Sequence, residues 1–407
     1  MSKIHIITGL DIGTTSTKVL VARKLPDRED LEVLSKIEEP SFGVRKGVIF
    51  NTDNVAEISQ VAKKKAEEES GRKIDSVYVN IGGSHIFSTF CHGLVSVSRA
   101  DKKISMEDVE RVLQAAQAAS LVSSNKEILK TLPKEFIVDG ESGLKDVVGM
   151  EGMRLEADVL TVGVFSPYLK NLTRAVSNAD FQINDITPSI LASARAVLKK
   201  KEKELGVVLV EIGAGTTGIA VFSEGELAHA IVLPIGSAHI TNDIAVGLKI
   251  DVDLAEKIKM EFGNCLHRGS DKKEKIELED EFLVFSHKEI ADIVGSRVAE
   301  IFSEVNKELK NISKQGQLPG GVVLTGGGAK LPKITELARK ELKLHCRIGK
   351  PHGFSPEQDD ISLSTVCGLV LGGQDLEEDG GFSGGFSVSL GGGVGSRIKK
   401  LFRIFLP

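Results

Sequence analysis

Residues 4–23 read IHIITGLDIGTTSTKVLVAR, and this stretch decides the fold. Two apolar runs flank a polar segment, a pattern that predicts a strand, a tight turn and a second strand. The candidate phosphate ligands in this turn are Gly13, Thr14, Thr15, Ser16 and Lys18, and Asp11 is the candidate catalytic residue that positions the metal and its waters. Glycine allows close backbone approach, N–H groups and hydroxyls bind phosphate oxygens, and Asp11 can hold a hydrated Mg2+ through its waters. A polar hairpin turn without a ligand is the alternative interpretation.

The same pattern recurs 200 residues later, where residues 207–222 read VVLVEIGAGTTGIAVF. Glu211 stands where Asp11 stands in the first copy. The further candidate ligands of this second turn are Gly213, Ala214, Gly215, Thr216 and Thr217. A duplicated strand–acid–Gly–Thr turn indicates two related half-molecules that face one another. Two such turns can hold a triphosphate from both sides.

A third glycine cluster lies in residues 320–345, GGVVLTGGGAKLPKITELARKELKLH. Gly326, Gly327 and Gly328 follow an apolar strand and precede a segment with apolar residues at helical spacing. Glycines at such a junction let a flat ligand lie against the backbone, although an ordinary helix entry explains them equally well. No P-loop motif is present, and no Rossmann fingerprint follows the first strand.

Composition describes an ordinary soluble globular chain of 407 residues, with 27% charged residues, mean hydropathy 0.00 and 42 glycines. A net charge of −5 and the lack of tryptophan disfavour nucleic-acid binding. The N-terminus lacks the long apolar core of a signal peptide, and no run of about 18 apolar residues predicts a membrane span. Four widely spaced cysteines favour free thiols in a reducing cytoplasm.

The last 32 residues change character. Residues 376–393, LEEDGGFSGGFSVSLGGG, are typical of a flexible linker. Residues 394–407 predict an amphipathic helix, with Val394, Ile398, Leu401, Phe402 and Phe405 on one stripe and Arg397, Lys399, Lys400 and Arg403 elsewhere. A basic amphipathic helix binds an anionic membrane surface. A terminal helix docked on the body is the alternative, which the long linker disfavours.

Segments 11–18, 211–217 and 326–328 resemble, in this order, the two phosphate loops and the adenosine loop of the actin-like ATPase superfamily. The whole chain resembles its FtsA family of bacterial cell-division proteins. Residues 77–86 (VYVNIGGSHI), residues 132–154 (LPKEFIVDGESGLKDVVGMEGMR) and the basic tail carry this further match. The resemblance implies an α/β, actin-like fold (ribonuclease H-like and duplicated) with two lobes and a nucleotide cleft. It also implies an FtsA-type inserted subdomain and a C-terminal amphipathic helix.

The domain limits that follow from the resemblance are expectations. They are a first lobe at 1–82 and 166–203, an inserted subdomain at 83–165, a second lobe at 204–236 and 318–375 with its own subdomain at 237–317, a linker at 376–393 and a membrane-targeting helix at 394–407. Within the insert, Ser105 and Asp108 are spaced as a helix cap, and Val109, Leu113 and Ala116 mark the apolar face of that helix.

The resemblance implies ATP and Mg2+ as cofactors, with Glu256 and Lys259 contacting ribose and adenine. A solvated helix pair is the alternative for these two residues. It implies filaments of the chain itself on the cytoplasmic side of the membrane at the division site, other division proteins as partners, and the C-terminal tail of FtsZ as a ligand of the second lobe's subdomain. Lys288 and Arg297 are basic candidates for that acidic tail.

Two departures from the superfamily pattern predict ATP binding with at most weak ATPase activity. Glu211, the second candidate catalytic residue that positions the metal and its waters, replaces the usual aspartate. Its extra methylene displaces the carboxylate by about 1 Å, enough to alter the metal-water geometry and slow the chemistry. The connecting segment 184–189, NDITPS, offers no Glu or Gln to orient the attacking water. Two other functions stay open at this point: a PilM-like ATP-binding protein of type IV pilus assembly, which lacks the terminal membrane helix, and a sugar kinase or chaperone ATPase.

Overall fold

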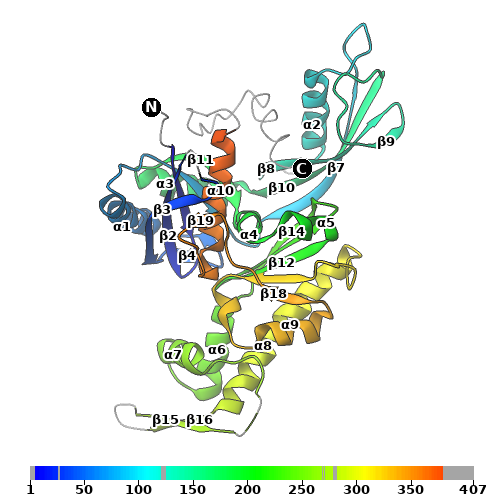
Figure 1. The fold of residues 1–407 in the computed structure, drawn as a ribbon. Coiled ribbons are helices and arrows are strands. Elements are labelled where there is room, and N and C mark those ends of the chain that lie inside the picture. Colours follow the sequence, from blue (N-terminus) through cyan, green and yellow to red (C-terminus); the bar gives the residue numbers. More distant parts are fainter. Residues whose placement is uncertain are drawn as a thin grey trace.

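The computed structural model describes residues 5–25, 28–120, 125–267, 269, 271–277 and 282–378. Its centre consists of two lobes, each built on a mixed sheet (Figure 1). The first sheet has the order β11-β6-β1-β2-β3-β19. Its strands are β1 (His5–Ile12), β2 (Ser16–Lys24), β3 (Leu31–Pro40), β6 (Ser76–Ile81), β11 (Gln182–Pro188) and β19 (Phe354–Ser355). Helix α1 (Thr52–Ser70) packs against β2 and β3, and a small hairpin of β4 (Val44–Arg45) and β5 (Val48–Ile49) precedes it.

The second sheet repeats the plan of the first in the order β14-β13-β12-β17-β18. Its strands are β12 (Val207–Ile212), β13 (Thr217–Ser223), β14 (Glu226–Leu233), β17 (Val322–Thr325) and β18 (Cys346–Ile348). Ile12 pairs with Thr17 at the end of the first hairpin, and Ile212 pairs with Thr217 at the end of the second. In each lobe the first strand is antiparallel to the second and parallel to the next one along the sheet. The duplication predicted from the two turns is therefore confirmed.

Both faces of the second sheet are covered, which explains why its strands are almost uniformly apolar. Along β12, Val207 and Leu209 belong to the core shared with the first lobe. Val208 and Val210, which point to the opposite face, belong to the separate core of the second lobe. The second core also includes the helices of that lobe, which are α6 (Ser237–Leu248), α7 (Val252–Phe262), α8 (His287–Asn311) and α9 (Ile334–Leu342). A hairpin of β15 (Lys273–Glu277) and β16 (Phe282–Ser286) precedes α8.

The inserted subdomain is a four-stranded sheet in the order β7-β10-β8-β9 with one helix on it. Its elements are β7 (Phe87–Ser96), α2 (Met106–Ser120), β8 (Lys126–Val138), β9 (Glu141–Leu144) and β10 (Arg154–Phe165). The predicted cap is present, because the Ser105 hydroxyl accepts a hydrogen bond from the Asp108 N–H and the Asp108 carboxylate accepts one from the Ser105 N–H. Val109, Leu113 and Ala116 are buried, as the pattern predicted.

The insert extends from the first lobe but also contacts the second (Figure 1). The Ser88 hydroxyl on β7 donates to the Ala230 carbonyl (2.9 Å) and accepts from the Ala230 N–H (3.1 Å) on the outer edge of β14. Glu226, at the start of β14, forms ion pairs with Lys134 (3.1 Å) and Lys145 (2.5 Å) of the insert. The insert thereby covers a sheet edge that would otherwise expose unpaired backbone groups.

The chain crosses between the lobes twice. The first crossing runs from α3 (Ser166–Asn178) and β11 through α4 (Ser189–Val197) and α5 (Lys200–Leu205) to β12. The second runs from β18 through β19 and the short turn η2 (Ile361–Leu363) to α10 (Ser364–Glu378). Helix α4 packs against α10 and contacts both sheets. The close fit depends on Gly368, since a Cβ there would lie 1.8 Å from the Ala192 carbonyl oxygen.

This second crossing corrects two expected boundaries. Residues 318–375 do not all belong to the second lobe, because β19 pairs with β3 and α10 packs on β1, β2 and β6 of the first lobe. The linker does not begin at residue 376, because α10 continues to Glu378. The amphipathic segment 394–407, with its apolar and basic residues, lies outside the described residues. No helix in the described part of the chain has the length and apolarity needed to cross a membrane.

Candidate functional site: the cavity between the lobes

The two predicted phosphate turns face one another across a cavity of about 710 Å³ between the lobes. Each turn is closed in the same way: the Gly13 N–H donates to the Ser16 carbonyl (3.0 Å), and the Gly213 N–H donates to the Thr216 carbonyl (2.9 Å). The first turn also contacts the β4–β5 hairpin, because the Thr14 hydroxyl accepts from the Gly47 N–H at 3.0 Å. The cavity has the size of an ordinary small-molecule site.

Asp11 lies at the end of β1 and is almost completely buried. Its Oδ1 accepts a hydrogen bond from the Asn80 side-chain amide at 2.7 Å, and the Asn80 Oδ1 accepts from the Ile12 N–H at 2.7 Å. Burial raises the pKa of Asp11 to about 6, while the charge of Lys18 acts in the opposite direction. The carboxylate is therefore held in a fixed orientation with limited access to water.

Lys18 lies opposite Asp11 on the neighbouring strand β2 and is also buried. Its ammonium group donates to the Ser16 hydroxyl at 2.9 Å and lies 3.5 Å from a carboxylate oxygen of Glu38 on β3. A buried ammonium needs such partners, because desolvation of a single charge is costly. Ser16 and Lys18 thus place one hydroxyl and one positive charge on the first-lobe side of the cavity.

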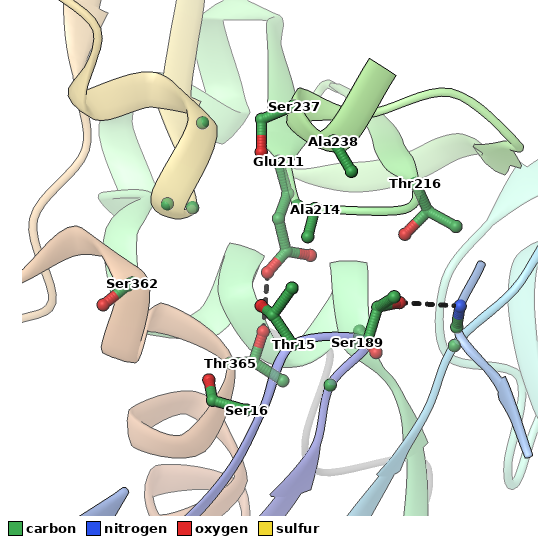
Figure 2. A pocket seen from close by; sticks show the side chains of 18 of the residues that line it. Thr15, Ser16, Ser189, Glu211, Ala214, Thr216, Ser237, Ala238, Ser362 and Thr365 are labelled. Carbon is green, nitrogen blue, oxygen red and sulfur yellow. Dashed lines mark hydrogen bonds between the residues drawn. The ribbon is translucent and has the colours of Figure 1, made fainter. Parts of the chain in front are cut away.

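Glu211 is the counterpart of Asp11 in the second lobe. Its Oε1 accepts hydrogen bonds from the hydroxyls of Ser193 on α4 and Thr365 on α10, both at 2.6 Å. Figure 2 shows the Glu211 side chain pointing toward Thr365. Burial raises the pKa of Glu211, and the two hydroxyl donors lower it. Neither donor belongs to the second-lobe sheet that carries Glu211.

The third glycine cluster forms another wall of the cavity. Gly326 has φ +84°, a conformation that favours glycine, and Gly328 packs against Ile212, where an added Cβ would lie 2.4 Å from a side-chain carbon. An added Cβ at Gly327 would meet no atom within 4 Å. The backbone is therefore accessible at Gly327, as the contact of a flat ligand requires.

Glu256 and Lys259 lie on α7 at the second-lobe end of the cavity. The Lys259 ammonium is 2.6 Å from the Glu256 carboxylate and donates to the Thr241 hydroxyl at 2.9 Å. Thr241 in turn donates to Glu256. Lys259 is buried, whereas the Glu256 side chain is 48% exposed. The ammonium group is therefore shielded from water, whereas the carboxylate of Glu256 is accessible.

The cavity walls carry more negative than positive charge. The lining carboxylates are Asp11, Glu38, Glu211, Asp253, Glu256 and Asp360, and the lining ammonium groups are Lys18, Lys259 and Lys330. A phosphate chain alone would meet net repulsion here, whereas a phosphate chain with a divalent cation would match these walls. Mg2+ is commonly held by one or two carboxylates, waters and phosphate oxygens, so the side chains present fit Mg2+ with a nucleotide.

Two of the turn residues predicted for the nucleotide site, Gly215 and Thr217, lie outside the cavity lining, as do Lys288 and Arg297, which were predicted for a partner surface. Gly215 packs against Lys46 and Thr14, and the buried Thr217 hydroxyl donates to the Ile235 carbonyl at 2.8 Å. Arg297 forms a two-pronged ion pair with Asp243 on α6 (2.6 and 2.8 Å) and a second with Glu300. Lys288, in the first turn of α8, is exposed. The remaining turn and loop residues predicted for the site all line the cavity.

Sequence reasoning missed Asn80, Ser193 and Thr365. A polar residue inside the apolar strand 76–81 was a usable signal for Asn80. No local signal marked Ser193 or Thr365, because small polar residues are common in helices. Asp185, in the connecting segment, is bonded to Lys130 of the insert at 2.9 Å and to the Thr187 hydroxyl at 2.9 Å. Of segment 184–189, only Ser189 lines the cavity.

Comparisons with known proteins agree with this architecture. The family model for cell division protein FtsA matches residues 208–368, and the model for the SHS2 domain inserted in FtsA matches residues 83–162. Cell division protein FtsA of Pseudomonas aeruginosa is 35% identical over 382 residues, covering 92% of this chain and 91% of the relative. FtsA of Bacillus subtilis is 36% identical over 374 residues, covering 91% of this chain and 84% of the relative.

The chain belongs to the FtsA family of cell division proteins. Its inserted sheet is accordingly the SHS2 domain of that family.

Solved structures place the FtsA-family chain in the actin-like fold. A PilM–PilN type IV pilus biogenesis complex matches with a TM-score of 0.66 at 16% identity, covering 90% of this chain and 98% of the other. MreB5 of Spiroplasma citri bound to ADP matches with a TM-score of 0.57 at 13% identity, covering 92% and 98%. Such identities show a shared fold alone. The PilM-like alternative therefore has weaker support than FtsA, which is supported by relatives at 35% and 36% identity that cover 92% and 91% of the chain.

Proposed function

We propose that this FtsA-family chain binds ATP with Mg2+ between its lobes, forms filaments on the cytoplasmic face of the membrane and tethers the FtsZ ring to it during septum formation. The observation that supports nucleotide binding is the pair of like turns facing one another across a cavity of carboxylates and lysines. Thr14, Thr15, Ser16, Lys18, Ala214 and Thr216 would hold the phosphates. Gly326, Gly327, Gly328, Glu256 and Lys259 would hold the nucleoside.

In this proposal Asp11 holds Mg2+ through water, and the bound cation would offset the phosphate charge. Hydrolysis is expected to be slow, below about 1 s⁻¹, because the lining described here holds no Gln and segment 184–189 contributes only Ser189. ATP affinity is expected to fall at least tenfold when Mg2+ is chelated, as measured by equilibrium dialysis. Equal affinity with and without Mg2+ would contradict the assignment of Asp11.

Membrane tethering is supported by the sequence of the last fourteen residues. Four basic groups contribute about 1 kcal/mol each near an anionic surface, and a helix of this length forms only weakly in water. Single molecules should therefore bind reversibly, and linked copies should bind more tightly. Filament formation supplies that linkage in this proposal.

The decisive test is co-sedimentation with anionic liposomes, ATP and FtsZ. The full chain is expected to carry FtsZ into the pellet, and a chain that lacks residues 394–407 is expected to stay in the supernatant while it still binds ATP. Phe402→Ala should release the protein, whereas Ile404→Ala, which lies off the apolar stripe, should have a smaller effect. Unchanged pelleting of the truncated chain would refute the role of the tail.

Binding of the FtsZ C-terminal tail is assigned to the second lobe's subdomain. Lys288 is exposed and available to an acidic peptide, whereas a carboxylate that approaches Arg297 must compete with Asp243 and Glu300. Lys288→Glu is therefore expected to reduce FtsZ recruitment. Lys307→Glu, on the same helix beside Glu304, is the matched control. If Lys288→Glu recruits as much FtsZ as the Lys307→Glu control does, Lys288 is not part of the binding surface.

A further inference from the structure

Glu211 stands in the second lobe, yet its described hydrogen-bond donors come from the two helices at which the chain crosses between the lobes. Ser193 is on α4, which leads the chain into the second lobe, and Thr365 is in the first turn of α10, which leads it back to the first. Both donor hydroxyls are 2.6 Å from the same oxygen, Oε1. We call Ser193 and Thr365 the hinge hydroxyls.

The number of hydroxyl hydrogens explains why the two helices are joined through the carboxylate. The two hydroxyl oxygens lie 3.0 Å apart, but each hydroxyl carries a single hydrogen. The shorter 2.6 Å contacts favour donation of both hydrogens to Oε1, and the carboxylate then joins α4 and α10 at this point. A hydrogen bond to a charged group is stronger than one between neutral groups, and both hinge hydroxyls are buried.

The length of the glutamate side chain is what permits this contact. An aspartate at position 211 would withdraw the carboxylate by about 1 Å, because its side chain is shorter by one methylene group. From there the carboxylate would lose at least one of its two 2.6 Å contacts unless the backbone moved. The departure from the superfamily pattern therefore coincides with a contact that only the longer acid makes in this geometry.

We propose that Glu211 acts as a positioning residue, which fixes the second phosphate turn relative to the first lobe through the hinge hydroxyls. Ile212 and Gly213 follow Glu211 directly and lead into that turn, so the carboxylate lies next to the segment whose position matters. This inference rests on the proposed function for its effect on ATP. Its geometric part, a fixed orientation of the lobes, does not depend on ATP.

The test measures the distance between the lobes without nucleotide. Spin labels are attached at Lys64→Cys on α1 and Lys340→Cys on α9, both exposed positions, in a Cys91→Ser background because the other three cysteines are buried. Glu211→Asp, Ser193→Ala and Thr365→Val are each expected to broaden the distance distribution. Thr161→Val, which removes a buried hydroxyl from the insert, is expected to leave it unchanged.

The second measurement is ATP affinity. The three hinge variants are expected to bind ATP at least tenfold more weakly than the parent chain, because the two turns are no longer held in register. A narrow, unchanged distance distribution in Glu211→Asp would overturn the inference. If the parent chain does not bind ATP, the proposed function fails, and the distance measurement still tests the positioning role of Glu211.

Discussion

The Asn80 side-chain amide donates to the Asp11 carboxylate at 2.7 Å, and this bond joins two neighbouring parallel strands at the edge of the cavity. Asn80 also donates to the Ser189 hydroxyl at 3.0 Å and accepts from the Ile12 N–H. One buried side chain therefore connects β6, the end of β1 and the first residue of α4. Asn80 lies in residues 77–86, which carried the family resemblance but predicted no role for this side chain.

Replacing Asn80 by alanine is expected to lower the free energy of unfolding by about 1–3 kcal/mol, because buried partners lose their hydrogen bonds. The measurement is urea denaturation followed by circular dichroism. Asn184→Ala is the matched control, since Asn184 lies in the adjacent strand and donates to the Ser76 hydroxyl at 3.0 Å without contacting Asp11. A loss no larger than that of the control would show that Asn80 does not hold this site together.

The pH dependence of stability should report the burial of Asp11. Because burial raises the pKa of Asp11 from 3.8 to about 6, ionisation is costlier in the folded chain than in the unfolded chain. The contribution of Asp11 to stability therefore falls as the pH rises from about 4 to about 6 and is constant above that range, with a total of at most about 3 kcal/mol.

Asp11→Asn should abolish this dependence. The variant gains stability relative to the parent chain from pH 4 to pH 6, as measured by urea denaturation at each pH. Asp75→Asn serves as a comparison in which the pH dependence has the opposite sign. Hydrogen bonding to Lys73 lowers the pKa of the exposed Asp75, so this variant should lose stability relative to the parent chain as the pH rises. A difference between Asp11→Asn and the parent that is the same at every pH would contradict the prediction.

Gly368→Ala should destabilise the contact between α4 and α10. The added Cβ would lie 1.8 Å from the Ala192 carbonyl oxygen, so the helices must separate, at an expected loss of about 1–3 kcal/mol. Gly372→Ala, one turn further along the same helix, meets only Arg195 at 3.9 Å and is expected to gain up to about 1 kcal/mol from helix propensity. Thermal or urea unfolding of the two variants compares them directly, and similar changes in both would argue against close packing at Gly368.

Ser88→Ala should loosen the contact between the insert and the second lobe. The Ala230 N–H, which donates to Ser88, would then be open to solvent and exchange its hydrogen faster. Hydrogen exchange with mass spectrometry of a peptide that spans residues 226–233 measures this effect. Thr89→Ala, at the exposed neighbouring position, should leave exchange at Ala230 unchanged. Unchanged exchange in Ser88→Ala would show that the insert does not protect this edge.

Much of the fold could be predicted because its signals are local. The two strand–turn–strand segments, the cap at Ser105 and the apolar face of the helix after Gly328 all depend on residues within one or two turns of each other. Ile334, Leu337, Ala338 and Leu342 are indeed buried on α9. The cavity lining could be predicted for the same reason, since each of its three loops is marked by its own glycines.

The rest of the site could not be predicted, because it depends on contacts between distant residues. Thr365 and Glu211 are 154 positions apart, and nothing in the sequence near Thr365 marks it as a ligand of a carboxylate. The return of α10 to the first lobe was missed for a similar reason. An apolar helix after residue 363 can pack on either sheet. The choice depends on close contacts with the first sheet: an added Cβ at Gly9 of β1 would lie 2.9 Å from the Val366 carbonyl oxygen of α10.

The sequence by itself determined that two like halves face one another with an acid, a glycine and hydroxyls at each turn, because the spacing of side chains along a strand and a turn is fixed by the backbone. The tertiary structure alone decided how those acids are held. Asp11 is bonded by an amide of its own lobe, whereas Glu211 is bonded by the helices that join the lobes. The physical reason is burial: each carboxylate needs donors where water is excluded, and only the packed chain brings those donors within hydrogen-bonding distance.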